Sequence, residues 1–465
     1  MAPQSPTPAD STYDLVVRSQ RVLVDGTFRP AAVVVRNGTI HAIADIAAPF
    51  SAVADVTLPD SQVLLPGIVD THVHVNEPGR TDWEGFASAT RAAAAGGVTT
   101  IIDMPLNSIP PTTTPEALAL KRTAAARQAT VDVGFWGGAI PSSLGHLREL
   151  HDAGVFGFKA FLSPSGVDEF PHLSTEQLHL ALAELAEFDG LLIVHAEDPA
   201  VLAEHENAGG VGYSDFVASR PESSELQAIE HLIEGLRMTG ARAHILHLSA
   251  ASALPAIRAA KADGLRLTVE TCPHYLSFAA EGIPDGATQY KCCPPIRDER
   301  NRVALWQALL SGDIDLIASD HSPSTRELKL AHGGDFGLAW GGISGLEVSL
   351  AAVWTAAHDQ QISLEAVSEW MSGSTSRLAA LPQKGSLAAG ADADFIAFAP
   401  DETFTVLADH LEHKNKLTAF EGSDLRGVVH TTWLAGAAVF SRDEAPLVST
   451  LSGRLLTPRS TPSPV

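Results

Sequence analysis

The chain has 465 residues, 45% of them apolar and 18% charged, which exceeds one ordinary domain and suffices for a large barrel with an accessory unit. Its 31 lysines and arginines against 55 aspartates and glutamates give a formal net charge of −24. This balance excludes a chain-wide binding surface for nucleic acid or for an anionic membrane, because both require clustered positive charge.

The two ends of the chain differ in composition from the rest. Residues 1–11 and 446–465 are rich in Ser, Thr and Pro, which predicts loose tails. The first residues lack the apolar run of a secretory signal, and no stretch approaches the roughly 18 apolar residues of a membrane span. The cysteines Cys272, Cys292 and Cys293 form no CxxC pair. We therefore expect reduced thiols and a cytoplasmic location.

Short β-rich segments occupy residues 12–65. The pairs Asp25-Gly26 and Asn37-Gly38 suit hairpin turns with positive φ. A similar β-rich sequence pattern occurs again over residues 384–445, for example in "LAAGADADFIAFAP" and "RGVVHTTWLAGAAVF". We expect these two regions to form one small β-sandwich domain built from both ends of the chain.

Between them, residues 66–383 are predicted to form a barrel. Eight short β-rich apolar segments alternate with segments of helical sequence pattern, and the first β-rich segment begins at the boundary of this region. The eight are "VLLPGIVDTHVH", "GGVTTIIDMP", "VDVGFWGGAI", "GVFGFKAFL", "LLIVHAED", "ARAHILHLS", "LRLTVETCPHYL" and "IDLIASDHSP". Eight β/α alternations fit an α/β fold of the (β/α)8 TIM-barrel type in count and length. An open doubly wound sheet is the alternative, but the Gly-rich phosphate turn usual after its first strand is missing.

The first of these segments carries two candidate metal ligands. His72 and His74 are two residues apart, so on a strand both side chains point to the same face. Such a pair alone occurs often enough on ordinary surfaces to be a weak signal. The positions of further polar residues make a metal site the favoured interpretation.

Four later segments each end with a candidate ligand: Lys159, His195, His247 and Asp320. All lie at or near the C-terminal ends of the predicted strands, where barrel enzymes build their active sites. His244 and His247 compete for one position. Because they face opposite ways on a strand and only His247 is near its end, we predict His247 as the ligand and His244 as a structural residue.

Lys159 is the unusual member of this set. A lysine within an apolar sequence segment ordinarily extends its side chain to solvent or pairs with a carboxylate. A desolvated, neutral lysine can instead add CO2 and become a carbamate, an anionic ligand with two oxygens. As this N6-carboxylysine, Lys159 would bridge two cations about 3.5–4 Å apart.

The motifs "DTHVH", "FKAFL", "VHAED", "HLS" and "SDHSP" together resemble the cyclic amidohydrolases of the amidohydrolase superfamily. The resemblance runs from about Tyr13 to Phe440. It implies two divalent ions, usually zinc, held as one pair of sites. The implied ligands are His72, His74 and Asp320 on one ion, His195 and His247 on the other, and carbamylated Lys159 between them.

The chemistry that this resemblance implies is hydrolysis of a cyclic amide. A metal-bridging water would have its pKa lowered toward about 7 and attack as hydroxide. Asp320 would serve as general base and then as general acid toward the departing ring nitrogen. A homotetramer is expected from the same resemblance.

Several motifs favour the allantoinase branch of the family, with neutral allantoin as substrate. They are "HVNEPGR", "SGVDEFP", "ETCPHYL", "KCCPPIRD", "WGGISGLE" and "HKNKLTAFEG". Related dihydroorotases typically carry an arginine where this chain has Asn76, which argues against a substrate carboxylate there. Backbone contacts near Cys293 and Gly341, and side-chain contacts from Asn76 and Asn107, are the expected substrate contacts. Asn107 could equally be a loop or cap residue.

Two alternatives stay open at this point. A hydantoinase or dihydropyrimidinase would share the metal ligands and accept overlapping substrates. A non-catalytic scaffold of the same fold would have lost metal ligands, whereas all six expected ligands are present in this chain.

Overall fold

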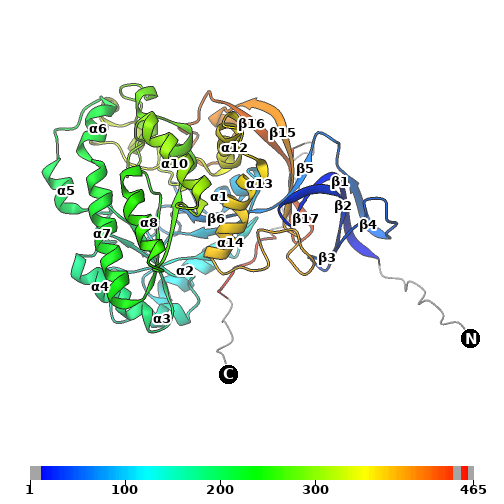
Figure 1. Cartoon of the computed structure of the whole chain (residues 1–465), viewed down its shortest axis with the longest axis horizontal. Helices are drawn as coiled ribbons and strands as arrows, with labels where there is room; N and C mark the ends of the chain where they lie inside the picture. The colour runs from blue at the N-terminus through cyan, green and yellow to red at the C-terminus, as the bar shows by residue number, and fades with distance from the viewer. Residues whose placement is uncertain (1–11, 443–451, 459–465) are drawn as a thin grey trace, which may run out of the picture.

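A computed structural model describes residues 12–442 and 452–458 of the chain. The predicted tail at 1–11 and the rest of the C-terminal segment lie outside the described residues. A barrel surrounded by helices stands beside a separate sheet (Figure 1). None of the helices in the described part of the chain is both long and apolar enough to cross a membrane.

The separate sheet combines strands from both ends of the chain. Its order is β17-β16-β15-β5-β1-β2-β3, with β4 also paired to β1. The strands are β1 (Tyr13–Val24), β2 (Thr27–Arg36), β3 (Thr39–Ala44), β4 (Ala52–Thr57), β5 (Val63–Pro66), β15 (Phe395–Thr405), β16 (Asp424–Leu434) and β17 (Ala437–Ser441). The short strand β5 joins the two halves, because it pairs with β1 on one side and with β15 on the other. One β domain built from both chain ends is therefore confirmed.

Both predicted hairpin turns are present in this sheet. Asp25 and Gly26 have φ of 50° and 74°, and Asn37 and Gly38 have φ of 53° and 72°. Each pair stands between strands in antiparallel register. The left-handed backbone of both central residues is what a two-residue hairpin requires, and Asn, Asp and Gly adopt it most readily.

The barrel contains the eight predicted β segments, all in parallel. Its strands are β6 (Ile68–Val73), β7 (Val98–Asp103), β8 (Asp132–Phe135) continued by β9 (Gly137–Gly138), β10 (Phe158–Phe161), β11 (Leu191–His195), β12 (Arg242–Ile245), β13 (Arg266–Thr271) and β14 (Leu316–Ile317). They follow one another in chain order around the barrel. The circle closes where the backbone N–H of His74 donates to the carbonyl of His321 at 2.8 Å. The predicted TIM barrel is thus confirmed.

Helices form the outer layer of the barrel and cover the connections (Figure 1). They are α1 (Phe86–Ala95), α2 (Pro115–Ala125), α3 (Leu147–Asp152), α4 (Thr175–Ala186), α5 (Pro199–Glu204), α6 (Tyr213–Ser219), α7 (Glu222–Thr239), α8 (Leu254–Ala262), α9 (Pro273–Ser277), α10 (Glu299–Ser311), α11 (Arg326–Leu330), α12 (Ser349–Asp359), α13 (Leu364–Ser368) and α14 (Ser374–Leu378). Their ends follow local chemistry. Ser174 caps α4 in a reciprocal pair with Gln177, and Gly240 ends α7 with φ of 67°.

Residues 452–458 differ from the predicted loose tail. Leu455 forms a parallel bridge with Val133 of the barrel. The Arg454 guanidinium lies 2.7 Å from a carboxylate oxygen of Asp132 and 2.6 Å from one of Asp392. The ion pairs of Arg454 and the packing of Leu455 and Leu456 against the hydrophobic clusters hold this segment at the barrel. Composition alone does not reveal such a partner.

Candidate metal centre

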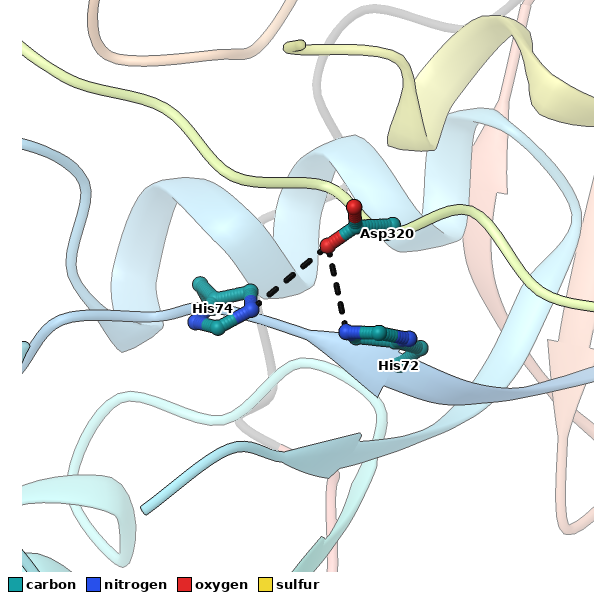
Figure 2. A group of neighbouring side chains, drawn as sticks. All are labelled: His72, His74 and Asp320. Carbon is teal, nitrogen blue, oxygen red and sulfur yellow. Dashed lines mark ion pairs between the residues drawn. The ribbon is translucent and has the colours of Figure 1, made fainter. Parts of the chain in front are cut away.

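The first group of candidate ligands lies between β6 and the segment that follows β14. His72 is in β6 and His74 directly follows it, so their side chains leave the same face of the strand (Figure 2). One carboxylate oxygen of Asp320 lies 3.1 Å from His72 Nε2 and 3.5 Å from His74 Nε2. The ligand atoms of the three residues lie within 4.8 Å of one another, which is close enough to hold one cation.

The second group joins two neighbouring strands. His195 is the last residue of β11, and His247 stands two residues beyond β12. His195 Nδ1 lies 3.0 Å from His247 Nε2. The His247 ring centroid is also 5.4 Å from that of His72. The two histidine groups therefore face one another across the mouth of the barrel.

Lys159 comes from the interior of β10 and lies among these residues. Its side chain is buried, with Nζ 4.6 Å from the centre of the Phe161 ring, which itself stacks on His195. Within the described chain, Nζ has no hydrogen bond and no carboxylate within ion-pair distance. Burial outweighs the attraction of Asp320 and Glu270 and lowers the pKa of Lys159 to about 7. The sequence places this lysine where it cannot extend to solvent.

Two buried glutamates hold the histidines from outside. Glu270 in β13 bonds His72 Nδ1 with one oxygen and lies 3.0 Å from His244 Nε2 with the other. Glu197 lies 2.7 Å from His195 Nε2 and is paired with Arg220. Each carboxylate holds a proton on the outer ring nitrogen, so that the inner nitrogen of His72 or His195 is the one that would bind a cation.

Sequence reasoning missed both glutamates, although a signal was present. Glu270 lies within the apolar text "LRLTVETCPHYL", and Glu197 stands two residues after His195. A carboxylate in a buried strand needs a partner, because an unpaired buried charge is strongly destabilising. The identity of that partner, His72 in one case, depends on residues almost 200 positions away.

The electrostatics of the first group favour positive charge. Burial opposes the ionisation of Asp320, but His72, His74 and His247 hold its pKa well below the usual value. Burial disfavours protonated His72, but Asp320 and Glu270 outweigh it and raise the pKa of His72 to about 9. Burial lowers the pKa of His74 to about 4. A bound cation would replace the His72 proton and satisfy the same carboxylates.

The residues present fit divalent metal ions. The inner nitrogen His72 Nε2 is buried and accepts no hydrogen bond from the described chain. The nitrogens His195 Nδ1 and His247 Nε2 face one another at 3.0 Å, so the lone pairs of both rings could bind one cation. Imidazole nitrogens and a carboxylate are ligands that zinc and similar ions prefer.

The backbone at the site leaves the strands in an uncommon conformation. His247 has φ of 36° and Asp320 φ of 45°, and the loop residues Asn76 and Asn107 have φ of 67° and 64°. Left-handed backbone is rare for residues other than Gly, Asn and Asp and concentrates at functional sites. Asp70 stabilises this arrangement, since its carboxylate accepts the backbone N–H groups of His72 and Ser319.

A cavity of about 350 Å³ opens above the six candidate ligands. Three of the four predicted substrate contacts, Asn107, Cys293 and Gly341, line it. Asn76 does not. Its side chain is fully buried and donates to the carbonyl of Pro323 at 3.3 Å. The positive φ of Asn76 turns the chain, so that its amide ties two loops together behind the cavity wall.

Comparison with known proteins places these features in context. Residues 63–439 match the amidohydrolase family. The chain is 57% identical over 434 residues to the allantoinase of Streptomyces avermitilis, covering 93% of this chain and 97% of that protein. It is 43% identical over 455 residues to the allantoinase of Saccharomyces cerevisiae, covering 94% and 98%. The solved structure of L-hydantoinase (dihydropyrimidinase) from Arthrobacter aurescens matches with a TM-score of 0.90 at 30% identity, covering 96% of this chain and 100% of that one.

Proposed function

Because the chain belongs to the amidohydrolase family, we propose that it hydrolyses the ring amide of allantoin to give allantoate in a metal-dependent reaction. The observation that carries this proposal is the 57% identity with an allantoinase over 97% of that enzyme's length. Similarity of that extent covers the barrel, the sheet and the cavity loops together. The family and the candidate ligands together make the protein a metal-dependent hydrolase.

The proposed metal centre would hold two zinc ions. His72, His74 and Asp320 would bind one ion, and His195 and His247 the other, with Lys159 between them as a carbamate. Bound divalent ions supply Lewis acidity, which polarises a carbonyl and lowers the pKa of water toward about 7. The convergence of these six side chains on one cavity supports the assignment.

Carbamylation of Lys159 is supported by its surroundings. The pKa of about 7 leaves a large fraction of the amine uncharged at neutral pH. An uncharged amine adds CO2 through its nitrogen lone pair and loses one proton, which yields an anionic carbamate. Neutral imidazoles do not balance the charge of bound cations, so an anion formed at Lys159 would be stabilised by those cations.

Asp320 is the proposed proton carrier. Its carboxylate is ionised and reaches into the cavity beside His72 and His74. It would take a proton from the attacking water and give it to the ring nitrogen when the amide C–N bond breaks. The oxygen of water ends on the carbonyl carbon, and the proton ends on the departing nitrogen, so the hydrolysis balances.

The loops around the cavity are proposed to recognise the ring. Arg80 of "NEPGR" donates to the carbonyl of Asn107 at 2.8 Å and pairs with Glu169. This residue therefore joins three loops at the mouth, and Asn76 contributes behind the wall rather than by direct contact. Cys293 and Gly341 would offer backbone groups and Asn107 its side chain, which suits the amides of a neutral ureide.

Three further features belong to the proposal and rest on family resemblance and composition. The protein would be cytoplasmic, consistent with its three cysteines, none of which forms a disulfide. It would also form a homotetramer. Its domain boundaries would be 12–65 and 384–445 for the sheet domain and 66–383 for the barrel. A hydantoinase is the second candidate, because a solved L-hydantoinase (dihydropyrimidinase) shares the fold over its whole length.

One set of assays tests the proposal. Purified protein is incubated with allantoin, hydantoin, dihydrouracil and dihydroorotate, with and without a metal chelator. Allantoin should have the highest kcat/KM, and chelation should abolish turnover until metal is restored. Faster turnover of dihydrouracil or hydantoin than of allantoin would replace the first candidate by the second. Activity that survives complete removal of metal would overturn the metal-dependent reaction.

A further inference from the structure

One wall of the cavity is a loop without regular structure. Six consecutive residues, 337–342, line the cavity. They follow a short turn at His332–Gly334 and precede Ile343, which bridges to His321 beside the metal centre. All N–H groups of 337–342 except that of Gly341 have acceptors in the described chain. The carbonyl groups of this loop need support from elsewhere, because they pair with no neighbouring strand.

Two buried lysines supply this support. Lys329 of α11 donates to the carbonyls of Trp340 at 2.9 Å and Lys291 at 2.7 Å, and also bonds the carbonyl of Gly342. Lys291 donates to the carbonyls of Ala339 at 2.6 Å and Gly337 at 3.2 Å. Four of the six loop carbonyls therefore point at an ammonium group. We call Lys291 and Lys329 the lysine clamp.

The hydrogen-bond partners of the clamp are backbone carbonyls, and Lys291 Nζ also lies 5.4 Å from the centre of the Phe216 ring. Lys329 and Lys291 are only 4% and 8% exposed, and within residues 12–442 and 452–458 neither has a carboxylate at ion-pair distance. A buried ammonium group is strongly disfavoured unless its N–H donors are satisfied. Burial lowers the pKa of Lys329 to about 7, and the three carbonyls favour its charged form, because they match the three N–H donors of the ammonium group.

This arrangement leaves one peptide group of the loop facing the cavity. In a planar trans peptide the carbonyl and the following N–H point in opposite directions. Because the carbonyl of Trp340 points at Lys329, the N–H of Gly341 points away from it. That N–H and the N–H of Cys293 have no acceptor in the described part of the chain. A Cβ at Gly341 would lie 3.8 Å from Cys293 Sγ, and both residues line the cavity, so the two residues that carry these N–H groups are neighbours there.

We propose that Lys329, assisted by Lys291, is a positioning residue that holds the Gly341 and Cys293 backbone N–H groups in place to bind the carbonyl oxygens of the substrate. The role of these N–H groups rests on the proposed function. The clamp itself rests on the contacts given above. Lys329 acts on binding through the loop, since it does not line the cavity, whereas Lys291 lines it.

Lys329→Met in the metal-loaded protein tests the proposal. The variant should raise KM for allantoin about tenfold or more, change kcat less than about threefold, and retain the wild-type metal content. Hydrogen exchange of the backbone amides in 337–343 should become about tenfold faster, while exchange in the barrel strands stays unchanged. An unchanged KM together with unchanged loop exchange would overturn the proposal, as would loss of metal or of kcat at constant KM.

Lys261→Met provides the matched control. Lys261 of α8 also donates to two backbone carbonyls, of Gly312 at 3.2 Å and Asp313 at 2.9 Å, and pairs with Asp315 at 2.6 Å, but lies outside the cavity lining. The Lys261→Met variant should keep the wild-type KM for allantoin and the wild-type rate of hydrogen exchange in residues 337–343. If Lys329→Met does not fold, Lys291→Met is tested by the same loop exchange. Hydrogen exchange requires no substrate. A wild-type protein that is inactive on allantoin would therefore refute the proposed function, whereas the exchange of the loop amides would still test the lysine clamp.

Discussion

Glu270 offers the sharpest test of how the barrel holds its candidate ligands. Its carboxylate contacts His72 Nδ1, the backbone N–H of His247 at 3.2 Å, and His244 Nε2 at 3.0 Å. One side chain therefore orients a residue from each proposed metal site. The substitution Glu270→Gln removes its negative charge while keeping its shape.

The structure indicates that the fold tolerates this substitution. The oxygen of a glutamine amide would still accept from His72 and from the His247 N–H. Its NH2 group would face His244, which can accept by changing tautomer, because Thr268 Oγ1 at 2.8 Å from His244 Nδ1 can donate or accept. What is lost is the charge that makes His72 a stronger ligand. Loss of such a partner typically weakens metal affinity about 10- to 100-fold, or about 1.4–2.7 kcal/mol.

Zinc titration of the apoprotein against a competing chelator measures this effect. Glu270→Gln should bind zinc about 10- to 100-fold more weakly, and saturating zinc should restore most of kcat. Glu225→Gln is the control, because Glu225 is equally buried and pairs with Arg297 at 2.6 Å but contacts no candidate ligand. Unchanged zinc affinity in Glu270→Gln, or an equal loss in the control, would refute the reasoning.

Three other predictions follow from the same contacts. Lys159→Ala should abolish allantoin hydrolysis, with partial recovery when metal and a short carboxylic acid are added; full activity without them would exclude a bridging role. Reactivation of the apoprotein by bicarbonate and zinc should accelerate as pH rises through about 7 and then level off, because the pKa of Lys159 is lowered to that value and only the neutral amine reacts. A rate that keeps rising toward the ordinary lysine pKa of about 10.4 would contradict this. Lys384→Met should lower the free energy of unfolding by about 3–5 kcal/mol in urea titration, because Lys384 is buried between Asp132, Asp392 and Asp394; a loss below about 1 kcal/mol would show that Arg454 alone neutralises them.

Much of the fold was predictable because it depends on local spacing. Strands and helices alternate eight times between residues 66 and 383, and each strand is short and apolar. Right-handed parallel connections leave few ways to arrange such units. The Asp25-Gly26 and Asn37-Gly38 turns could also be predicted from the sequence, because few other residue pairs adopt positive φ at two consecutive positions.

The candidate site was predictable in its ligands and less so in its surroundings. His72, His74, His195, His247 and Asp320 stand at or just beyond strand ends, which a barrel brings to one rim, whereas Lys159 reaches the same cavity from the interior of β10. The loop residue Asn76 shows the limit of this reasoning. An asparagine where related dihydroorotases carry an arginine suggested a substrate contact, which stays a prediction; in the structure the side chain is buried and does not line the cavity.

The sequence by itself determined the barrel, the domain formed by both chain ends and the set of candidate ligands, because each follows from periodicity or from position on a strand. Only the tertiary structure decided which imidazole nitrogens face inward, since Glu270 reaches His72 across 198 residues. It also decided how Lys329 shapes the cavity wall and why residues 452–458 are held against the barrel. Those contacts join side chains that no local pattern relates, and they exist only once the barrel has closed and its interior has lost water.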